Sequence, residues 1–253
     1  QQNILLFILD GFQSDLFWDL IDNEPGIKEA FPGFTFYPNT ASVYAKTFPT
    51  IPLLLTGKTY IKQQPFVDFL PRSYENSLLS SLVNEGWDIV APIPSCALMF
   101  KQELPLLFPD DKDVVKVSQA IFDPFEYLML RHKEGKLDTQ FKNSLGKVAY
   151  HAACHQRVQN IGSKTREILQ LIPDTEVKAI ERCSGHDGTY AVKSEFHEHA
   201  MKIGRPVVNQ IKQFEADHYG SDCAMAGHHI ENGLANGQQP EHPVTLLRKA
   251  YGI

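Results

Sequence analysis

Three of the four cysteines stand where a hydrophobic run of strand length gives way to a turn or a helix start. Cys154 follows the run Gly146–Tyr150, Cys183 follows Glu176–Ile180, and Cys223 has a similar setting. In α/β proteins, ligands and catalytic groups gather at such strand ends. Thiolate sulfur is a soft donor that holds zinc and iron–sulfur clusters. We therefore predict that these cysteines converge on one metal or iron–sulfur site.

The segments around these cysteines resemble a known domain. The tripeptide Cys183–Gly185 and the runs Val158–Gly162 and Gly227–Gly233 are similar to the Cys-Cys-Gly domain of iron–sulfur oxidoreductases. That domain occurs in heterodisulfide reductase subunits and in the C subunit of anaerobic glycerol-3-phosphate dehydrogenase. The resemblance implies an electron-transfer protein with a thiolate-bound iron–sulfur cluster and a redox partner protein.

The chain departs from that domain at two positions. Ser184 stands where the second cysteine of the Cys-Cys pair would be, and Ala226 where the second cysteine of a final Cys-x-x-Cys would be. A complete thiolate set for the family's cluster is therefore not present, and three thiolates would hold a smaller cluster or zinc. A nearby imidazole would then complete the ligand set. The candidate imidazoles are those of His155, His186 and His228.

The fourth cysteine, Cys96, opens a predicted helix after the short strand Asp88–Ala91. This segment resembles the end of an earlier repeat of the same domain, in which Cys96 would be the last ligand. The upstream cysteines of such a repeat do not occur in the chain. An inert helix-start thiol is therefore the favoured interpretation of Cys96.

A second resemblance lies near the N-terminus. The run Asn3–Leu9 predicts a buried strand that ends at Asp10, and Thr47 is placed as the N-cap of a helix. This part is similar to the N-terminal part of the alkaline phosphatase superfamily, which includes sulfatases and phosphodiesterases. The resemblance implies that Asp10 ligates a divalent metal such as zinc or manganese and that Thr47 is the nucleophile. A capping threonine is the simpler interpretation, and the superfamily's later ligands have no convincing match.

The two resemblances divide the chain. Residues 1–86 resemble the phosphatase and sulfatase superfamily, and residues 87–253 resemble the iron–sulfur oxidoreductases. We interpret the chain as a fusion of two such parts, joined near Gly86, in which neither parent site is complete. Three functions stay open. They are a redox protein, which is favoured, a metal-dependent phosphodiester or sulfate ester hydrolase, and a binding protein that has lost both chemistries.

Strands and helices alternate along the chain. This pattern predicts a doubly wound α/β fold with a mostly parallel sheet and flanking helices. One expected helix starts at Pro124 with Asp123 as its cap, and another spans Ser163–Leu171. Further expected elements are helices at Phe196–Ile203 and Val207–Phe214, a break between them at Gly204–Pro206, a linker and helix cap at Gln102–Asp111 and a last helix after Pro243.

The composition is that of a globular protein, with 253 residues of which 43% are hydrophobic and 21% charged. The formal charge of −6 argues against a nucleic-acid-binding surface. No apolar run reaches the roughly 18 to 20 residues of a membrane span, so we expect no transmembrane segment. Four cysteines in this length do not form a disulfide scaffold, and we expect reduced thiols and a cytoplasmic location.

Overall fold

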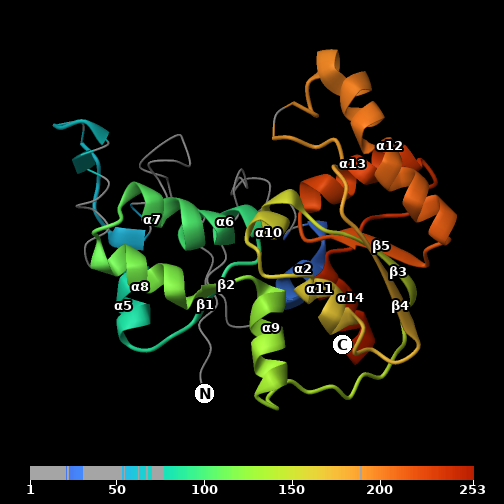
Figure 1. The fold of residues 1–253 in the computed structure, drawn as a ribbon, viewed down its shortest axis with the longest axis horizontal. Helices are drawn as coiled ribbons and strands as arrows, with labels where there is room; N and C mark the ends of the chain where they lie inside the picture. The colour runs from blue at the N-terminus through green and yellow to red at the C-terminus, as the bar shows by residue number, and fades with distance from the viewer. Residues whose placement is uncertain are drawn as a thin grey trace. The chain divides into compact units, whose positions relative to one another are not determined.

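The fold is described from a computed structural model (Figure 1). Contacts divide the chain into two compact units, Gln1–Leu78 and Leu79–Ile253. Asp10 and Thr47 lie outside the described residues, so the predicted hydrolase site stays a prediction. The described residues are 21, 23–30, 53, 55–61, 63–66, 68–69, 77–188 and 190–253.

In the first unit, the described residues include a short helix and a small aromatic cluster. The helix α2 spans Pro25–Ala30. The ring of Tyr60 packs against Phe66 and Phe69, with centroids 5.0 and 5.2 Å away. The Tyr60 hydroxyl donates to the carbonyl of Gln64 at 2.8 Å. These contacts join four residues that are close in the sequence, Tyr60, Gln64, Phe66 and Phe69.

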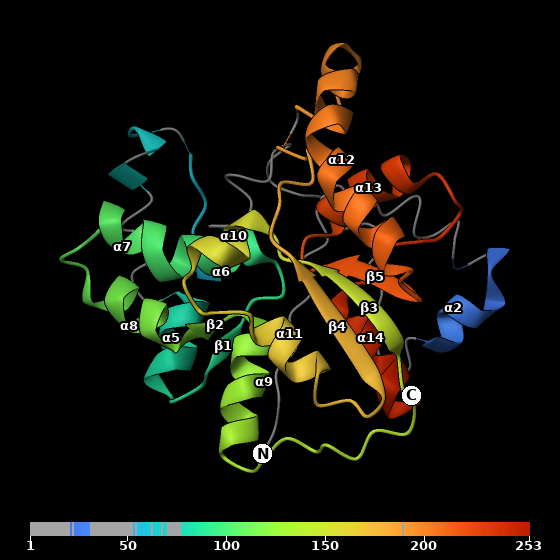
Figure 2. The same ribbon diagram turned by 45° about the vertical axis from the view of Figure 1, so that its right-hand side comes forward.

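The second unit contains a parallel sheet of three strands, β3 (Gly146–His151), β4 (Thr175–Ile180) and β5 (His218–Ser221). The strands lie in the order β4-β3-β5, so the strand that comes first in the sequence lies in the middle (Figure 2). The register aligns the last residues of all three strands in one row. The prediction of an α/β fold with a parallel sheet is confirmed.

The helices of this region alternate with its strands along the sequence. Caps and turns set where these helices begin and end. In α14, for example, Pro243 lies in the first turn, and Gly252, with a φ of 69°, follows the last turn. The helices are α9 (Pro124–Lys133), α10 (Cys154–Val158), α11 (Lys164–Leu169), the 3-10 turn η2 (Ser194–Phe196), α12 (His197–Phe214), α13 (Ala224–Leu234) and α14 (Pro243–Tyr251).

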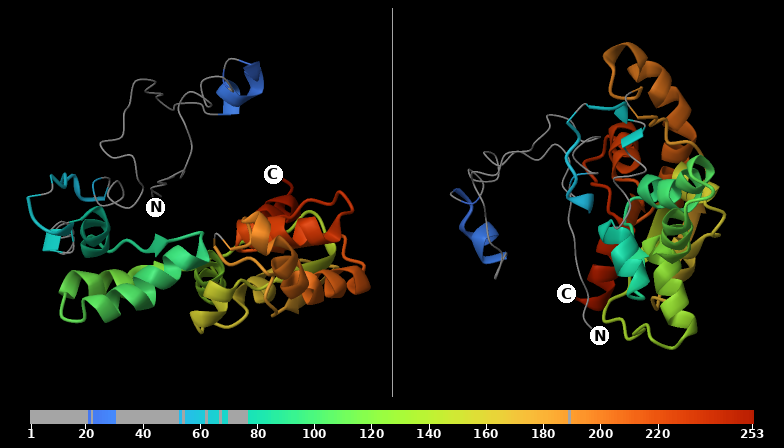
Figure 3. Two further views of the ribbon diagram at one scale, coloured as in Figure 1. Left: turned by 90° about the horizontal axis from the view of Figure 1, so that it is seen from above. Right: turned by 90° about the vertical axis from the view of Figure 1, so that its left-hand side faces the viewer.

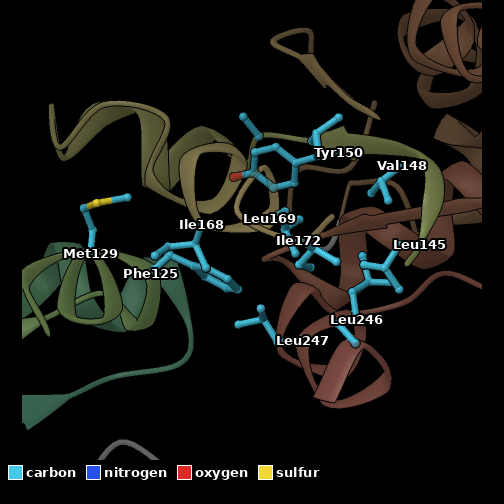
Figure 4. Packing of buried hydrophobic residues seen from close by; sticks show 13 residues of the cluster. Phe125, Met129, Leu145, Val148, Tyr150, Ile168, Leu169, Ile172, Leu246 and Leu247 are labelled. Atoms are coloured by element: carbon cyan, nitrogen blue, oxygen red, sulfur yellow. The ribbon is translucent and has the colours of Figure 1, made fainter. Parts of the chain in front are cut away.

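Side chains of β3 alternate between two hydrophobic cores, one on each face of the sheet. Val148 and Tyr150 belong to the first core, which also contains residues of α9, α11 and α14 (Figure 4). Ala149 belongs to the second core, with residues of α12 and α13. Each fully buried Ile or Leu side chain in such a core contributes roughly 1.5–3 kcal/mol. Helices therefore cover both faces of the sheet, as a doubly wound fold requires.

A smaller parallel sheet precedes this one in the sequence, and pairs β1 (Ile89–Val90) with β2 (Ile121–Phe122). Asp123 follows β2 and caps α9, because its Oδ1 accepts from the Phe125 N–H at 2.9 Å. Glu126 Oε2 accepts in return from the Asp123 N–H at 3.2 Å. This capping box confirms the predicted helix start. The other helices of this region are α5 (Leu78–Asn84), α6 (Pro94–Leu98), the π-helical turn η1 (Met99–Glu103), α7 (Leu104–Leu107) and α8 (Lys112–Ala120).

Two predictions about helices were wrong. α12 runs without a break through Gly204–Pro206, and Pro206 lies inside the helix. Gly204 does not end the helix. Its missing side chain allows the Ser184 carbonyl oxygen to pack close to the helix backbone. The stretch Gln102–Phe108 is not a linker, since most of it lies in η1 and α7, whereas the predicted helix cap after it is confirmed at Asp111. The first error came from a local signal that tertiary packing overrode.

The helix α12 has 18 residues and packs along α13 (Figure 3). Its buried residues recur every three or four positions, which is typical of a helix that covers a sheet. Among the residues that the structure describes, no helix is both long and apolar enough to pass through a lipid bilayer. The buried residues of α12 are Ala200, Gly204, Val207, Val208 and Ile211.

Candidate functional site

Three cysteines share one edge of the three-stranded sheet. His151, the last residue of β3, pairs with Ile180 of β4 on one side and with Ser221 of β5 on the other. The chain reaches a cysteine within three residues of each of these positions. Parallel strands end at the same edge, so all three loops leave the sheet from one side. These strand-end cysteines are Cys154, Cys183 and Cys223.

The helices that follow the three strands lie on different faces of the sheet. α11, which follows β3, contributes to the first core, whereas α12 and α13, which follow β4 and β5, contribute to the second. The chain therefore leaves the middle strand towards one face and leaves both neighbours towards the other. In open α/β sheets, ligands bind beyond the strand ends at such a switch point.

Each strand-end cysteine has its own surroundings. Cys154 is exposed at the start of α10, and its Sγ accepts a hydrogen bond from Arg157 Nη2 at 3.4 Å. Cys183 is also exposed, and its Sγ accepts from the Gly185 N–H at 3.4 Å. Cys223 is partly exposed and is the N-cap residue of α13. Hydrogen bonds to sulfur help to set the potential of a bound cluster, so two of these environments suit ligand thiols.

The strand-end cysteines fit a soft metal or a cluster in donor type and in position along the sheet. All four cysteines of the chain are free thiols. Their side chains are not gathered into a cage, because the described residues contain no group of three His, Cys, Asp or Glu side chains placed to hold a metal ion. Convergence on one metal therefore stays a prediction. Binding would require the strand-end loops to turn their side chains towards one another.

The histidines predicted as a fourth ligand differ in exposure. His155 is exposed in α10, and His228 is exposed in α13 with its Nδ1 3.0 Å from Glu231 Oε2. His186 is partly buried in the loop after Cys183. Burial and the neighbouring His229 imidazole lower the pKa of His186. Of the three predicted ligands, His186 has the most shielded imidazole.

His229 was not predicted as a ligand at the strand-end cysteines, yet it faces the loop after Cys183. It is 7% exposed, and its Nε2 is buried with no hydrogen-bond partner among the described residues. An ideal Cβ built on Gly185 would lie 2.9 Å from this nitrogen. The sequence held a signal, because His229 shares a helical face with Ala226 and Ile230, which are both buried.

The loop after Cys183 packs closely on α12. An ideal Cβ on Gly185 would lie 2.1 Å from the carbonyl oxygen of Ala200, and one on Gly204 would lie 2.3 Å from that of Ser184. Gly185 also has a φ of 87°, in the left-handed region that favours glycine. Contact between backbones at these two glycines therefore fixes the path of the loop.

His151 touches the ends of the two neighbouring strands. It is 1% exposed, and burial lowers its pKa. Its Nε2 lies 2.9 Å from the Arg182 carbonyl oxygen, and its Nδ1 lies 3.0 Å from Ser221 Oγ. Ser221 Oγ also accepts from the Cys223 N–H at 3.3 Å. Sequence reasoning missed this residue, although a lone polar side chain at the end of an apolar run was a signal.

A ring of four buried polar side chains joins β3, α10, α11 and the residue after β5. Gln156 Nε2 donates to Thr165 Oγ1 at 3.0 Å, and Thr165 Oγ1 donates to Asp222 Oδ1 at 3.1 Å. The Tyr150 hydroxyl contacts both Gln156 Oε1 and Asp222 Oδ2. Burial raises the pKa of Asp222 to about 7. Burial and the neighbouring Asp222 carboxylate raise the pKa of Tyr150 well above its ordinary value.

The protons available in this ring favour a neutral Asp222. Tyr150 has one hydroxyl proton for two oxygen neighbours. When that proton goes to Gln156, the contact between Tyr150 and Asp222 needs a proton on the carboxyl group. The hydroxyl groups of Tyr150 and Thr165 then each donate one hydrogen bond and accept one. A neutral Asp222, which its raised pKa favours, would supply the fourth proton that the four contacts of this ring need.

Comparison with known proteins finds a distant similarity. No family model matches the chain. The chain is 29% identical over 171 residues to the C subunit of the anaerobic glycerol-3-phosphate dehydrogenase of Escherichia coli K12, and equally to that of Escherichia coli O157:H7. The match covers 66% of this chain and 41% of the length of each of these relatives. The chain, which spans about two fifths of them, is thus a distant relative of a subunit of an anaerobic dehydrogenase.

Proposed function

We propose that this chain carries electrons as part of an oxidoreductase, with the strand-end cysteines as thiolate ligands of an iron–sulfur cluster. The observation that carries the proposal is the shared register of β3, β4 and β5, which brings three thiols to one sheet edge. The similarity to a dehydrogenase subunit supports it. Bound at this edge, a cluster would supply one-electron chemistry.

The protein's own residues would bind the cluster and set its surroundings. The strand-end cysteines would supply three ligands, and the imidazole of His186 or His155 would supply the fourth. The Arg157 guanidinium and the Gly185 N–H would donate to two of the ligand sulfurs, at the distances already seen for the thiols. Zinc is the alternative occupant, because three thiolates and one imidazole are a common zinc ligand set.

The surroundings of the site suit a partner protein. The relatives are named as a subunit, so we propose that this chain also works with a redox partner. Cys154 and Cys183 are exposed, which leaves this edge of the sheet open to a partner surface. Free thiols persist in a reducing compartment, and we propose a cytoplasmic location on that ground.

Anaerobic reconstitution with ferrous iron and sulfide tests the proposed function. We expect the unmodified protein to bind iron and sulfide and to absorb at about 400 nm, the region of iron–thiolate charge transfer. A triple variant with Cys154→Ser, Cys183→Ser and Cys223→Ser is expected to lose both properties. Cys96→Ser is the matched control, because it removes another exposed thiol from the same chain, and it should bind iron like the unmodified protein.

Three outcomes would count against the cluster. Equal iron content in the unmodified protein and the triple variant would show that the strand-end cysteines are not ligands. Zinc that binds to the unmodified protein, and not to the triple variant, would replace the cluster with a zinc–thiolate site. A protein that binds neither metal would leave a binding protein without metal chemistry or a manganese-dependent hydrolase.

A further inference from the structure

His151 makes two hydrogen bonds that reach beyond the pairing of the strands. The last backbone bond between β3 and the β4 segment runs from the Ala152 N–H to the Ile180 carbonyl at 3.1 Å. Arg182 lies two residues further along the chain, where the ladder no longer holds the segment. His151 Nε2 lies 2.9 Å from the Arg182 carbonyl oxygen and therefore holds the backbone directly before Cys183.

The second hydrogen bond of His151 leads to the loop after β5. A carbonyl oxygen can only accept, so Nε2 carries the proton that is donated to Arg182. In a neutral imidazole, Nδ1 is then an acceptor, and the Ser221 hydroxyl donates to it at 3.0 Å. The Ser221 oxygen in turn accepts from the Cys223 N–H at 3.3 Å. One buried side chain is thus linked to the backbone at two of the strand-end cysteines.

We infer that His151 is a positioning residue, which sets where the Cys183 and Cys223 loops leave the sheet relative to the middle strand. Its imidazole is 1% exposed and lies on the middle strand, so both neighbouring loops are held from one rigid point. The inference deepens the proposed function, because these loops would carry two of the ligands. His151 itself is not a ligand in this proposal.

The two nitrogens of His151 allow the two links to be separated. Glutamine places its amide nitrogen near the position of Nε2, and so retains a donor for Arg182. Asparagine places its amide oxygen near the position of Nδ1, and so retains an acceptor for Ser221. Leucine fills similar space and retains neither link. Ser221→Ala removes the Cys223 link while His151 keeps its bond to Arg182.

Alkylation rates of the four thiols, measured residue by residue by mass spectrometry on the metal-free protein, test this inference. We expect His151→Leu to raise the rates at Cys183 and Cys223 by at most about fivefold, with the smaller rise at the already exposed Cys183, because each loop loses one hydrogen bond. Cys154 and Cys96 should keep their rates. His151→Gln should restore Cys183 alone, and His151→Asn should restore Cys223 alone.

Two variants keep the test decisive. Thr175→Val removes a partly buried hydrogen bond from the Leu145 N–H at the opposite edge of the sheet, and should leave all four thiol rates unchanged. Ser221→Ala should raise the rate at Cys223 alone, and it carries the test if His151→Leu does not fold. Unchanged rates at Cys183 and Cys223, or an equal rise at all four thiols, would overturn the inference. Because no metal is present, a failed reconstitution would reject the proposed function without touching this result.

Discussion

The two parallel sheets of the unit Leu79–Ile253 place cysteines in similar local settings with different neighbours. In the smaller sheet, β1 is followed by α6, which contains the exposed Cys96. Its partner β2 ends level with β1, and Asp123 follows directly as the cap of α9. In the larger sheet, a cysteine follows each of the three strands within three residues of the aligned row.

This difference shows that a local sequence motif and the register of the strands give different information about whether a cysteine belongs to a ligand site. A strand, a turn and a thiol near a helix start occur at Cys96 as well as at Cys154. In the smaller sheet, the residue after the neighbouring strand is a carboxylate that caps a helix. In the larger sheet, the neighbouring strands are followed by further cysteines. A ligand site therefore depends on which strand ends lie level with one another, and the following predictions test that contrast.

The largest expected effect is that of Gly185→Ala in the loop after Cys183. The new Cβ would lie 2.1 Å from the Ala200 carbonyl oxygen, at a φ of 87°. Backbone strain and overpacking together should lower the free energy of unfolding by roughly 3–5 kcal/mol, as measured by urea denaturation. Gly135→Ala, in the turn after α9, is the control, because its φ is 67° and nothing lies within 4 Å. It should cost about 1–2 kcal/mol, and equal losses would contradict close packing of the Cys183 loop.

The next effect is a pH dependence that comes from Asp222. Its pKa is raised to about 7 in the folded protein, above the ordinary value of 3.8, so the folded state holds a proton that the unfolded chain has lost. This stabilisation is complete below pH 4 and is lost as the pH rises to about 7. The slope should be at most about 1.4 kcal/mol per pH unit.

The variant Asp222→Asn isolates this contribution, because an amide resembles the neutral carboxyl group and does not titrate. Buried His151, with its lowered pKa, acts in the opposite sense by adding stability as the pH rises towards 6.5. The measurement is therefore the difference in free energy of unfolding between Asp222→Asn and the unmodified protein from pH 4 to pH 8. That difference should grow in favour of the variant and level off above pH 7, and a constant difference would show that Asp222 is ionised throughout.

The smallest effect is expected for Asp123→Ala, at the residue between β2 and α9. Loss of the capping box of α9 should cost about 1–2 kcal/mol in thermal or urea unfolding. Asp111→Ala, at the partly exposed cap of α8, is the matched control and should cost about 1 kcal/mol or less. Neither change should alter metal binding by the strand-end cysteines. A larger loss for Asp111→Ala than for Asp123→Ala would contradict the stabilising role of the capping box.

Several elements were predictable because their signals lie close together in the sequence. The apolar run at Gly146–Tyr150 identified β3, and Asp123 with Pro124 identified the start of α9. The predicted break at Gly204–Pro206 failed for the opposite reason. A glycine two residues before a proline commonly ends a helix, but Gly204 accommodates the Ser184 carbonyl from a distant part of the chain.

The polar residues around the strand ends were predictable only in part. The cysteines were recognised because a thiol is a potential metal ligand wherever it lies in a fold. His228 was preferred to His229 although the two are adjacent, because residue type cannot show which imidazole turns towards a loop about 40 residues earlier in the sequence. His151 and Asp222 were missed, since an isolated polar residue at a strand end acquires its partners only when the sheet assembles.

Short-range information was enough to establish which residues follow each strand, where α9 and α14 begin, and that the fold alternates strands with helices. Caps, turns and apolar runs act within a few residues, so the linear order contains them. The strand order β4-β3-β5 and its register arose from packing between segments far apart in the chain. That packing, through two cores on opposite faces of the sheet, aligned three separate thiols along one edge.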